Sequence, residues 1–297
     1  MSTSQITRLM SNETLARVER LRINSSRRFT NKSRGEHLAG KGGQSIEFSD
    51  YRDYCDGDDV RYIDWNIFSR LRRPYMKIYH EEEEQHVVIL IDGSSSMQFE
   101  GKFERAKELA AAFGTMGLMA LERVSCWAFN DGTGPLPRFR PTTGRTQMNK
   151  LFSFVEGVEA GGDTPVDRGI ETLLKYHRGR GVAIVISDFL TPADIGRTFN
   201  LLYSSGMEVM ALQILGPTEI DPDVTGDVRF VDCETSTRLD VSSAASLLDL
   251  YQEYRLAFEA NLEGACRKRG GQFISTNSGD SLEHVLFDQL LRKGWIK

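Results

Sequence analysis

The sequence predicts an α/β fold, in which helices flank a doubly wound, mostly parallel sheet. Residues 87–91 and 182–187 are continuous apolar runs, which are typical of strands buried on both faces of a parallel sheet. From residue 87 onward such runs alternate with segments of helical periodicity, and this alternation indicates helices on both faces of the sheet. We therefore expect the α/β domain at residues 87–297, after a small N-terminal subdomain of helix and short strands at residues 1–86.

Length, charge and cysteine content narrow the class of protein. The chain has 297 residues and a net charge of −5, so the molecule as a whole offers no general attraction to nucleic acid. Its start does not resemble a signal peptide, and no apolar run approaches the ~20 residues that span a bilayer. Cys55, Cys126, Cys233 and Cys266 form no C-x-x-C pair. We expect a cytoplasmic protein without membrane insertion, whose cysteines are buried structural thiols.

The N-terminal subdomain begins with a short amphipathic helix and a basic connector. Leu15, Val18 and Leu21 fall on one helical face, and Asn12 can cap the first turn. Residues 25–43 are rich in arginine, lysine and glycine. One interpretation of this segment is an arm that binds nucleic acid or an acidic partner, but no aromatic stacking platform accompanies its charges. We favour a solvated connector.

Acidic residues and arginines are mixed closely between residues 45 and 86. Asp56, Gly57 and Asp58 signal a turn, and residues 75–80 alternate as an extended segment does. The Asp-x-Asp spacing invites a calcium-loop interpretation, but the glycine falls one position early and the terminal glutamate of such a loop is missing, since Asp64 stands there. We favour a web of arginine–carboxylate bonds that ties the small subdomain to the main domain.

The elements of the α/β domain follow in alternation. Strands are expected at residues 87–91, 124–129, 182–187, 209–215 and 272–276, and helices at residues 103–121, 148–158, 165–176, 193–204, 244–269 and 281–293. Residues 136–139 are expected to pair beside the second strand as an antiparallel edge, and residues 227–232 and 237–241 to form a hairpin. Pro165 and Pro192 mark helix starts, and Gly206 marks a helix end.

Five side chains with oxygen donors lie in loops at one expected edge of this sheet. Asp92, Ser94 and Ser96 follow the first buried strand, Thr164 lies in a Gly-Gly loop before a helix, and Asp188 ends another strand. No histidine or cysteine is near them in sequence, so the set suits Mg²⁺, with Mn²⁺ or Ca²⁺ as alternatives, and disfavours zinc or copper. The alternative for the serines and for Asp188 is helix capping.

These residues resemble the metal-ion-dependent adhesion site (MIDAS) of von Willebrand factor A (vWA) domains, whose Rossmann-like fold suits the stretch from residue 87 to residue 293. The preceding stretch resembles the conserved region of the bacterial DUF58 family through Gly57-Asp58-Asp59-x-Arg61-x-Ile63-Asp64-Trp65 and Lys77-x-Tyr79-x-Glu81-Glu82. That family is encoded beside MoxR-type AAA+ ATPases and is thought to act with them in chaperone-like assembly or maturation of target proteins. The resemblance implies a vWA domain, a metal ion held by the five residues, and such an ATPase or its client as partner.

The pattern favours binding over catalysis. Position 94 is serine where a phosphate-transferring Asp-x-Asp pair needs an acid, and no nucleophile elbow, phosphate-binding P-loop or dinucleotide fingerprint is present. We expect a protein that is not an enzyme: a divalent-metal-dependent adaptor that grips an acidic side chain of a protein partner. The alternative is a metal-dependent phosphatase or hydrolase using the same ion, for which the sequence offers no clear general base or nucleophile.

Overall fold

The structure, a computed structural model, contains two compact units. Met1–Ser26 and Gln85–Lys297 form the large unit, and Arg27–Glu84 forms the small unit. The structure describes residues 5–25, 30–31, 46–82, 85–130, 135–162, 165–191, 194–223, 226–231, 238–241 and 247–297. Thr164, Cys233 and most of the basic connector lie outside these ranges. The small unit is thus inserted in the large one, and the segment before it belongs to the large unit.

A six-stranded sheet lies at the centre of the large unit, counted over its described residues. Its strands are β4 (His86–Asp92), β5 (Arg123–Phe129), β6 (Arg138–Thr142), β7 (Gly181–Ser187), β8 (Met207–Leu215) and β11 (Gln272–Asn277). Their order is β11-β8-β7-β4-β5-β6, and every neighbouring pair is parallel except β5 with β6. The predicted fold class is confirmed, including the antiparallel edge.

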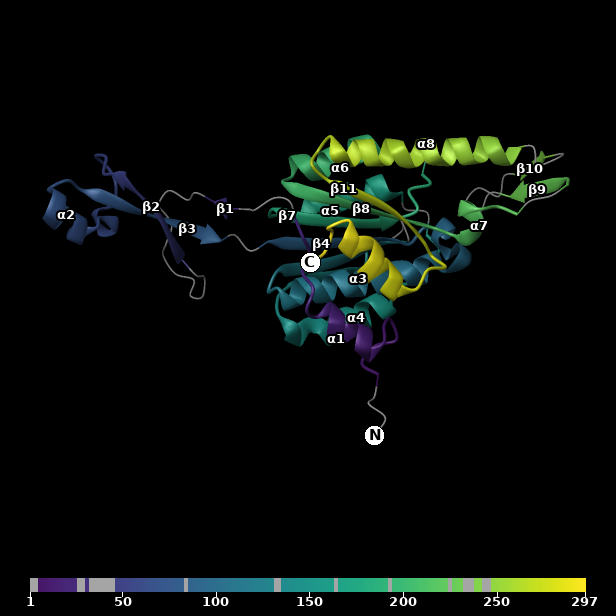
Figure 1. Ribbon diagram of the computed structural model, residues 1–297, viewed down its shortest axis with the longest axis horizontal. Helices are drawn as coiled ribbons and strands as arrows, with labels where there is room; N and C mark the ends of the chain where they lie inside the picture. The colour runs from purple at the N-terminus through teal and green to yellow at the C-terminus, as the bar shows by residue number, and fades with distance from the viewer. Residues whose placement is uncertain are drawn as a thin grey trace. The chain divides into compact units, whose positions relative to one another are not determined.

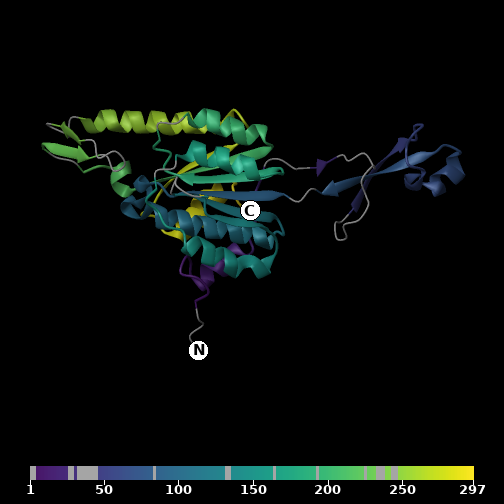
Figure 2. The same cartoon turned by 180° about the vertical axis from the view of Figure 1, so that it is seen from behind.

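Helices cover both faces of this sheet (Figures 1 and 2). On one face lie α1 (Asn12–Val18), α3 (Lys102–Met119) and α4 (Met148–Glu156), and on the other α5 (Val166–Tyr176), α6 (Ile195–Ser204) and α8 (Leu248–Arg267). Alternate side chains of β4 pack on opposite faces of the sheet. Ile89 and Ile91 belong to the apolar cluster under α3, whereas Val88 and Leu90 belong to the cluster under α5 and α6. This two-sided burial is why the strand reads as an unbroken apolar run.

Short elements complete the large unit. They are the 3₁₀ segments η2 (Ser95–Gly101) and η3 (Arg145–Gln147), the one-turn helix α7 (Pro217–Ile220), and the π-helical segment η5 (His284–Leu290) within the predicted last helix. The predicted hairpin is confirmed as β9 (Val228–Val231) paired antiparallel with β10 (Arg238–Val241). None of the described helices is both long and apolar enough to cross a membrane.

The first helix, α1, packs on the large unit. Its N-cap is Ser11, whose Oγ accepts a hydrogen bond from the Thr14 amide at 3.1 Å, so the predicted cap at Asn12 is wrong by one residue. The chain after α1 pairs with the C-terminal segment: the Arg22 amide donates to the Lys297 carbonyl at 2.8 Å, and the Lys297 amide donates back at 2.9 Å. Residues 22–24 and 294–297 are therefore bound to one another across the sequence.

The small unit holds an antiparallel sheet in the order β1-β3-β2, built from β1 (Thr30–Asn31), β2 (Ile46–Asp53) and β3 (Tyr75–Glu82). The 3₁₀ segment η1 (Val60–Tyr62) and helix α2 (Trp65–Leu71) lie between β2 and β3, in a stretch for which the sequence predicted only a turn. Asp64 caps α2 by accepting from the Asn66 and Ile67 amides at 2.9 and 3.1 Å.

The predicted arginine–carboxylate web is present in this unit. Arg52 donates two hydrogen bonds to Asp58, at 2.6 and 2.8 Å, and Arg61 pairs with Asp59. These bonds join residues of the same unit, so they stabilise the small unit itself rather than tying it to the main domain. Because Asp58 is engaged by an arginine, the arrangement differs from that of a calcium loop.

Candidate functional site

The predicted site lies where the direction of strand order changes. The chain runs from β4 to β5 and β6 on one side, and then to β7, β8 and β11 on the other. The carboxyl ends of β4 and β7 therefore flank a topological switch point, the usual place for a ligand in an open α/β sheet. The parallel register pairs Ile91 with Ile186, which sets Asp92 beside Ser187 and brings Asp188 to the same edge.

Asp92 is buried at the end of β4, with 4% of the residue exposed. Its Oδ1 accepts from the Ser94 amide at 2.9 Å, and its Oδ2 accepts from the Ser187 hydroxyl at 2.5 Å. Burial raises the pKa of Asp92 to about 6, and the nearby negative charge of Asp188 adds to this effect. Burial and the charge of a nearby carboxylate both destabilise the charged form of Asp92, and a bound cation would stabilise it.

The serine loop brings two more oxygens to this edge. The Ser94 and Ser96 hydroxyls lie 3.0 Å apart and share a hydrogen bond. The Gly-Gly loop lies against them, because the Gly161 and Gly162 amides both donate to the Gly93 carbonyl, at 2.9 and 3.2 Å. Ser94 also forms a parallel bridge with Gly162. Thr164 is not among the described residues, so its predicted role as a ligand stays a prediction.

Asp188 is paired with a buried lysine that the sequence did not indicate. The Lys102 ammonium lies 2.8 Å from Asp188 Oδ2 and 2.7 Å from Glu219 Oε1. Burial alone would lower the pKa of Lys102, but the Asp188 and Glu219 carboxylates outweigh burial and hold it above its usual value. Asp188 Oδ1 accepts from the Leu190 amide at 3.0 Å, so both oxygens of this carboxylate are engaged.

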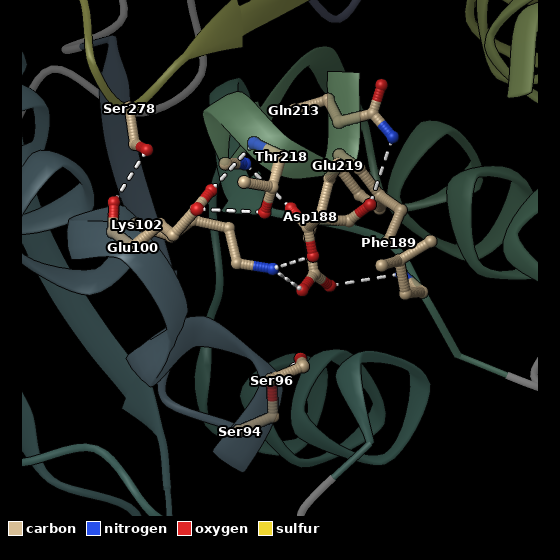
Figure 3. A network of polar contacts seen from close by, with 12 residues as sticks. Ser94, Ser96, Glu100, Lys102, Asp188, Phe189, Gln213, Thr218, Glu219 and Ser278 are labelled. Atoms are coloured by element: carbon tan, nitrogen blue, oxygen red, sulfur yellow. Dashed lines mark hydrogen bonds and ion pairs between the residues drawn. The ribbon is translucent and has the colours of Figure 1, made fainter. Parts of the chain in front are cut away.

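Figure 3 shows that this ion pair belongs to a wider network, with Ser94 and Ser96 beside it. Glu219 comes from α7 and also accepts from the Gly216 amide at 2.6 Å. Glu100 accepts from the Thr218 amide and hydroxyl at 2.9 and 2.8 Å, and the Glu100 carbonyl accepts from Ser278 at 2.7 Å. The network therefore connects the ends of β7, β8 and β11 to the start of α3.

The charge and the donor types at this edge fit a divalent cation. Asp92, Asp188 and Glu219 supply three carboxylates against the single ammonium of Lys102, which leaves two formal negative charges. The neighbouring donors Ser94 and Ser96 are hydroxyls, which Mg²⁺ accepts and zinc does not prefer. Within the described part of the chain, no three His, Cys, Asp or Glu side chains form a metal cluster by themselves. An ion would therefore depend on the serine hydroxyls together with Asp92 and Asp188.

Sequence reasoning missed Lys102 and Glu219. A signal for Glu219 exists, because it follows β8 within four residues and the carboxyl ends of parallel strands meet at one edge of the sheet. Lys102 gives no such signal, since a lysine at a helix start is ordinarily solvated. Outside the site, Cys126 and Cys266 are buried free thiols as predicted, whereas Cys55 is exposed.

The sequence matches one protein family and is similar to known proteins. Residues 50–261 match the model of a family described as "Protein of unknown function DUF58". An uncharacterized protein of Mycobacterium tuberculosis is 28% identical over 251 residues, which cover 81% of this chain and 77% of that protein.

Two solved structures are also similar. BatB of Bacteroides thetaiotaomicron has 15% identity and a TM-score of 0.43 over 71% of this chain and 98% of its own. An aerotolerance-related membrane protein of Bacteroides fragilis has 17% identity and a TM-score of 0.40 over 65% and 91%.

Proposed function

This chain belongs to the DUF58 family, and we propose that it is a non-catalytic, divalent-metal-dependent adaptor whose vWA-type domain binds a protein partner. The observation that carries the proposal is the meeting of Asp92, Ser94, Ser96 and Asp188 at the switch point of the sheet. Their oxygens suit Mg²⁺, with Mn²⁺ or Ca²⁺ as alternatives, and the cluster has the negative charge that a divalent ion would balance.

The bound ion would supply Lewis acidity for an acidic side chain of the partner. Asp92 and Asp188 would neutralise the ion, and the neutral hydroxyls of Ser94 and Ser96 would add ligands without adding charge. An ion held in this way keeps affinity for an outside carboxylate. Thr164 completes the proposed ligand set.

From the family resemblance we propose that the partner is a MoxR-type AAA+ ATPase or its client. The two proteins would act together in chaperone-like assembly or maturation of target proteins. The proposal includes a cytoplasmic location, which the free thiols of Cys126 and Cys266 support. A phosphatase or hydrolase that uses the same ion would require a base or nucleophile beside it. The described carboxylates at the site are instead engaged by Ser187, by Lys102 and by backbone amides.

The first test is thermal unfolding with Mg²⁺ and with chelator. A bound ion stabilises the folded state by mass action, so Mg²⁺ should raise the Tm of the wild-type protein. Ser96→Ala removes one hydroxyl ligand and should shrink this rise. Ser153→Ala is the matched control, because Ser153 is exposed in α4, away from the site, and its hydroxyl donates to the Asn149 carbonyl of the same helix at 3.0 Å.

The same variants should then be tested for capture of the purified ATPase. We expect capture by the wild type and by Ser153→Ala in Mg²⁺, and loss of capture in chelator or in Ser96→Ala. Equal capture under all four conditions would refute the metal-dependent adaptor. Phosphoester turnover that requires Asp188 would favour the hydrolase instead.

A further inference from the structure

Lys102 is an unexpected residue at the N-terminus of α3. Its side chain is fully buried, with 0% exposed, and it is the first residue of the helix. The partial positive charge of a helix N-terminus disfavours a cation there. Burying an ion pair in addition costs desolvation energy, and replacement of such a pair by apolar side chains is often neutral or stabilising. The fold alone therefore gives little reason to keep an ammonium at this position.

The position of the ammonium relates it directly to the candidate metal site. Lys102 contacts the same carboxylate, Asp188, that the divalent ion would use (Figure 3). Its second contact, Glu219, pulls the ammonium towards α7. A divalent ion that approaches Asp188 meets a fixed positive charge already bound there, and like charges a few ångströms apart repel strongly in a partly buried site.

We propose that Lys102 is a built-in counter-ion that lowers the affinity of the site for divalent cations by competing for Asp188, and that Glu219 limits this competition by sharing the ammonium. The inference rests on the proposed metal site and adds the residues that set its strength. Because the chain alone holds the ion weakly, a partner carboxylate strengthens the binding. Adhesion is then reversible, and the ion dissociates more readily once the partner has left.

The formal charges predict opposite changes in ion affinity for substitutions of Lys102 and of Glu219. Lys102→Met leaves three carboxylates without an internal cation, so the site should attract a divalent ion more strongly. Glu219→Gln removes the negative charge of the second partner of the ammonium, so Lys102 should pair with Asp188 more strongly and the site should bind the ion more weakly. A purely structural role of the pair does not predict tighter binding in one variant and weaker binding in the other.

The experiment measures Mn²⁺ binding to the full chain by electron paramagnetic resonance, with Mg²⁺ competition. Lys102→Met should bind Mn²⁺ at least about tenfold more tightly than the wild type, and Glu219→Gln several-fold more weakly. Lys107→Met and Glu104→Gln are the matched controls, because these two residues form an ion pair at 3.0 Å on the same helix. Both controls should stay within about twofold of the wild type.

Each outcome bears on a stated claim. Equal or weaker binding by folded Lys102→Met refutes the counter-ion role while leaving the adaptor proposal intact. If Lys102→Met does not fold, Glu219→Gln decides, and unchanged or tighter binding by this variant refutes the inference. Equal Mn²⁺ binding by the wild type and Asp92→Ala means that the site does not hold the ion, and this result refutes the adaptor proposal as well.

Discussion

His86 is a residue whose environment has a direct consequence for stability. It begins β4, and its ring packs edge-to-face on His177 with 5.1 Å between ring centroids. Burial lowers the pKa of His86 to about 4, and the positive charges of His177 and Arg123 add to this effect. In the unfolded chain the pKa returns to about 6.5. Between pH ~6.5 and ~4, His86 is therefore protonated in the unfolded state but not in the folded state.

We therefore predict that His86 makes the protein sensitive to acid. Its contribution to stability is complete above pH ~6.5 and is lost as the pH falls towards ~4. His86→Gln removes this group, so the urea midpoint should fall less between about pH 7.5 and about pH 5 than it does in the wild type. His284→Gln is the control for removal of an exposed histidine. An identical fall in His86→Gln would contradict the prediction.

The candidate site shows which residues a sequence can indicate. The spacing of Asp92, Ser94 and Ser96 is local, and strand ends predict where Asp188 lies, so the sequence predicts that these residues meet. The Lys102–Asp188–Glu219 cluster depends on three segments far apart in sequence that pack together. Neither apolar periodicity nor spacing carries information about such a contact, so only the structure reveals it.

Helix α5 illustrates how closely the elements around the site are packed. A Cβ on Gly169 would lie 2.5 Å from two ring atoms of Phe129 at the end of β5. The ring is rigid and fully buried, so it cannot move aside cheaply. The absence of a side chain at this position therefore allows α5 to lie directly on the sheet, where it begins just after the Thr164 loop.

Two glycine substitutions should have opposite effects on stability. Gly169→Ala should cost about 1–3 kcal/mol through overpacking against Phe129. Gly264→Ala in α8 should instead stabilise by about 0.5–1 kcal/mol, because alanine favours helix and no described atom lies within 4 Å of the added Cβ. Urea unfolding of both variants measures the difference. Equal effects from the two changes would show that the close packing at Phe129 is relieved by adjustment of α5.

Long elements were predicted better than short ones. Strands β4 and β7 are long enough to appear as continuous apolar runs, and helices α3, α4, α5, α6 and α8 are long enough to show a period. In contrast, α7 has four residues and α2 has seven, and both depend on local capping. The cap of α2 is Asp64, and no repeating pattern in the sequence indicates that a helix begins after it. Short elements of this kind are determined by single hydrogen bonds rather than by a repeating pattern.

The two compact units differ in how much apolar surface they bury. Both apolar clusters belong to the large unit, whereas Ile63 and Met76 are the buried hydrophobic side chains described in the small one. The small unit also exposes large side chains, among them Trp65 at 59% and Leu71 at 61%. Because the side chains of this unit whose burial is described contribute little burial to offset chain entropy, hydrogen bonds such as those between Arg52 and Asp58 are expected to carry a larger share of its stability.

We predict that the small unit opens more readily than the large one. In hydrogen–deuterium exchange of the whole chain, amides of β2 and β3 should exchange well before those of β4 and β7. Arg52→Lys loses the two-pronged bond to Asp58 and should speed exchange in β2 further, without changing β4. Equal protection of β3 and β7 would show that the small unit is stabilised by something other than its own core.

The pairing of residues 22–24 with residues 294–297 has a consequence for biosynthesis. Trp295 and Ile296 are almost fully buried, and the Asn24 amide donates to the Trp295 carbonyl at 2.8 Å. A ribosome releases residues 22–24 long before it makes their partners. The early segment must therefore wait, through translation of the whole inserted unit and the sheet, for residues 294–297. The large unit can close only after these residues have been made, and a nascent chain halted before residue 294 would leave residues 22–24 unpaired and open to chaperones and proteases.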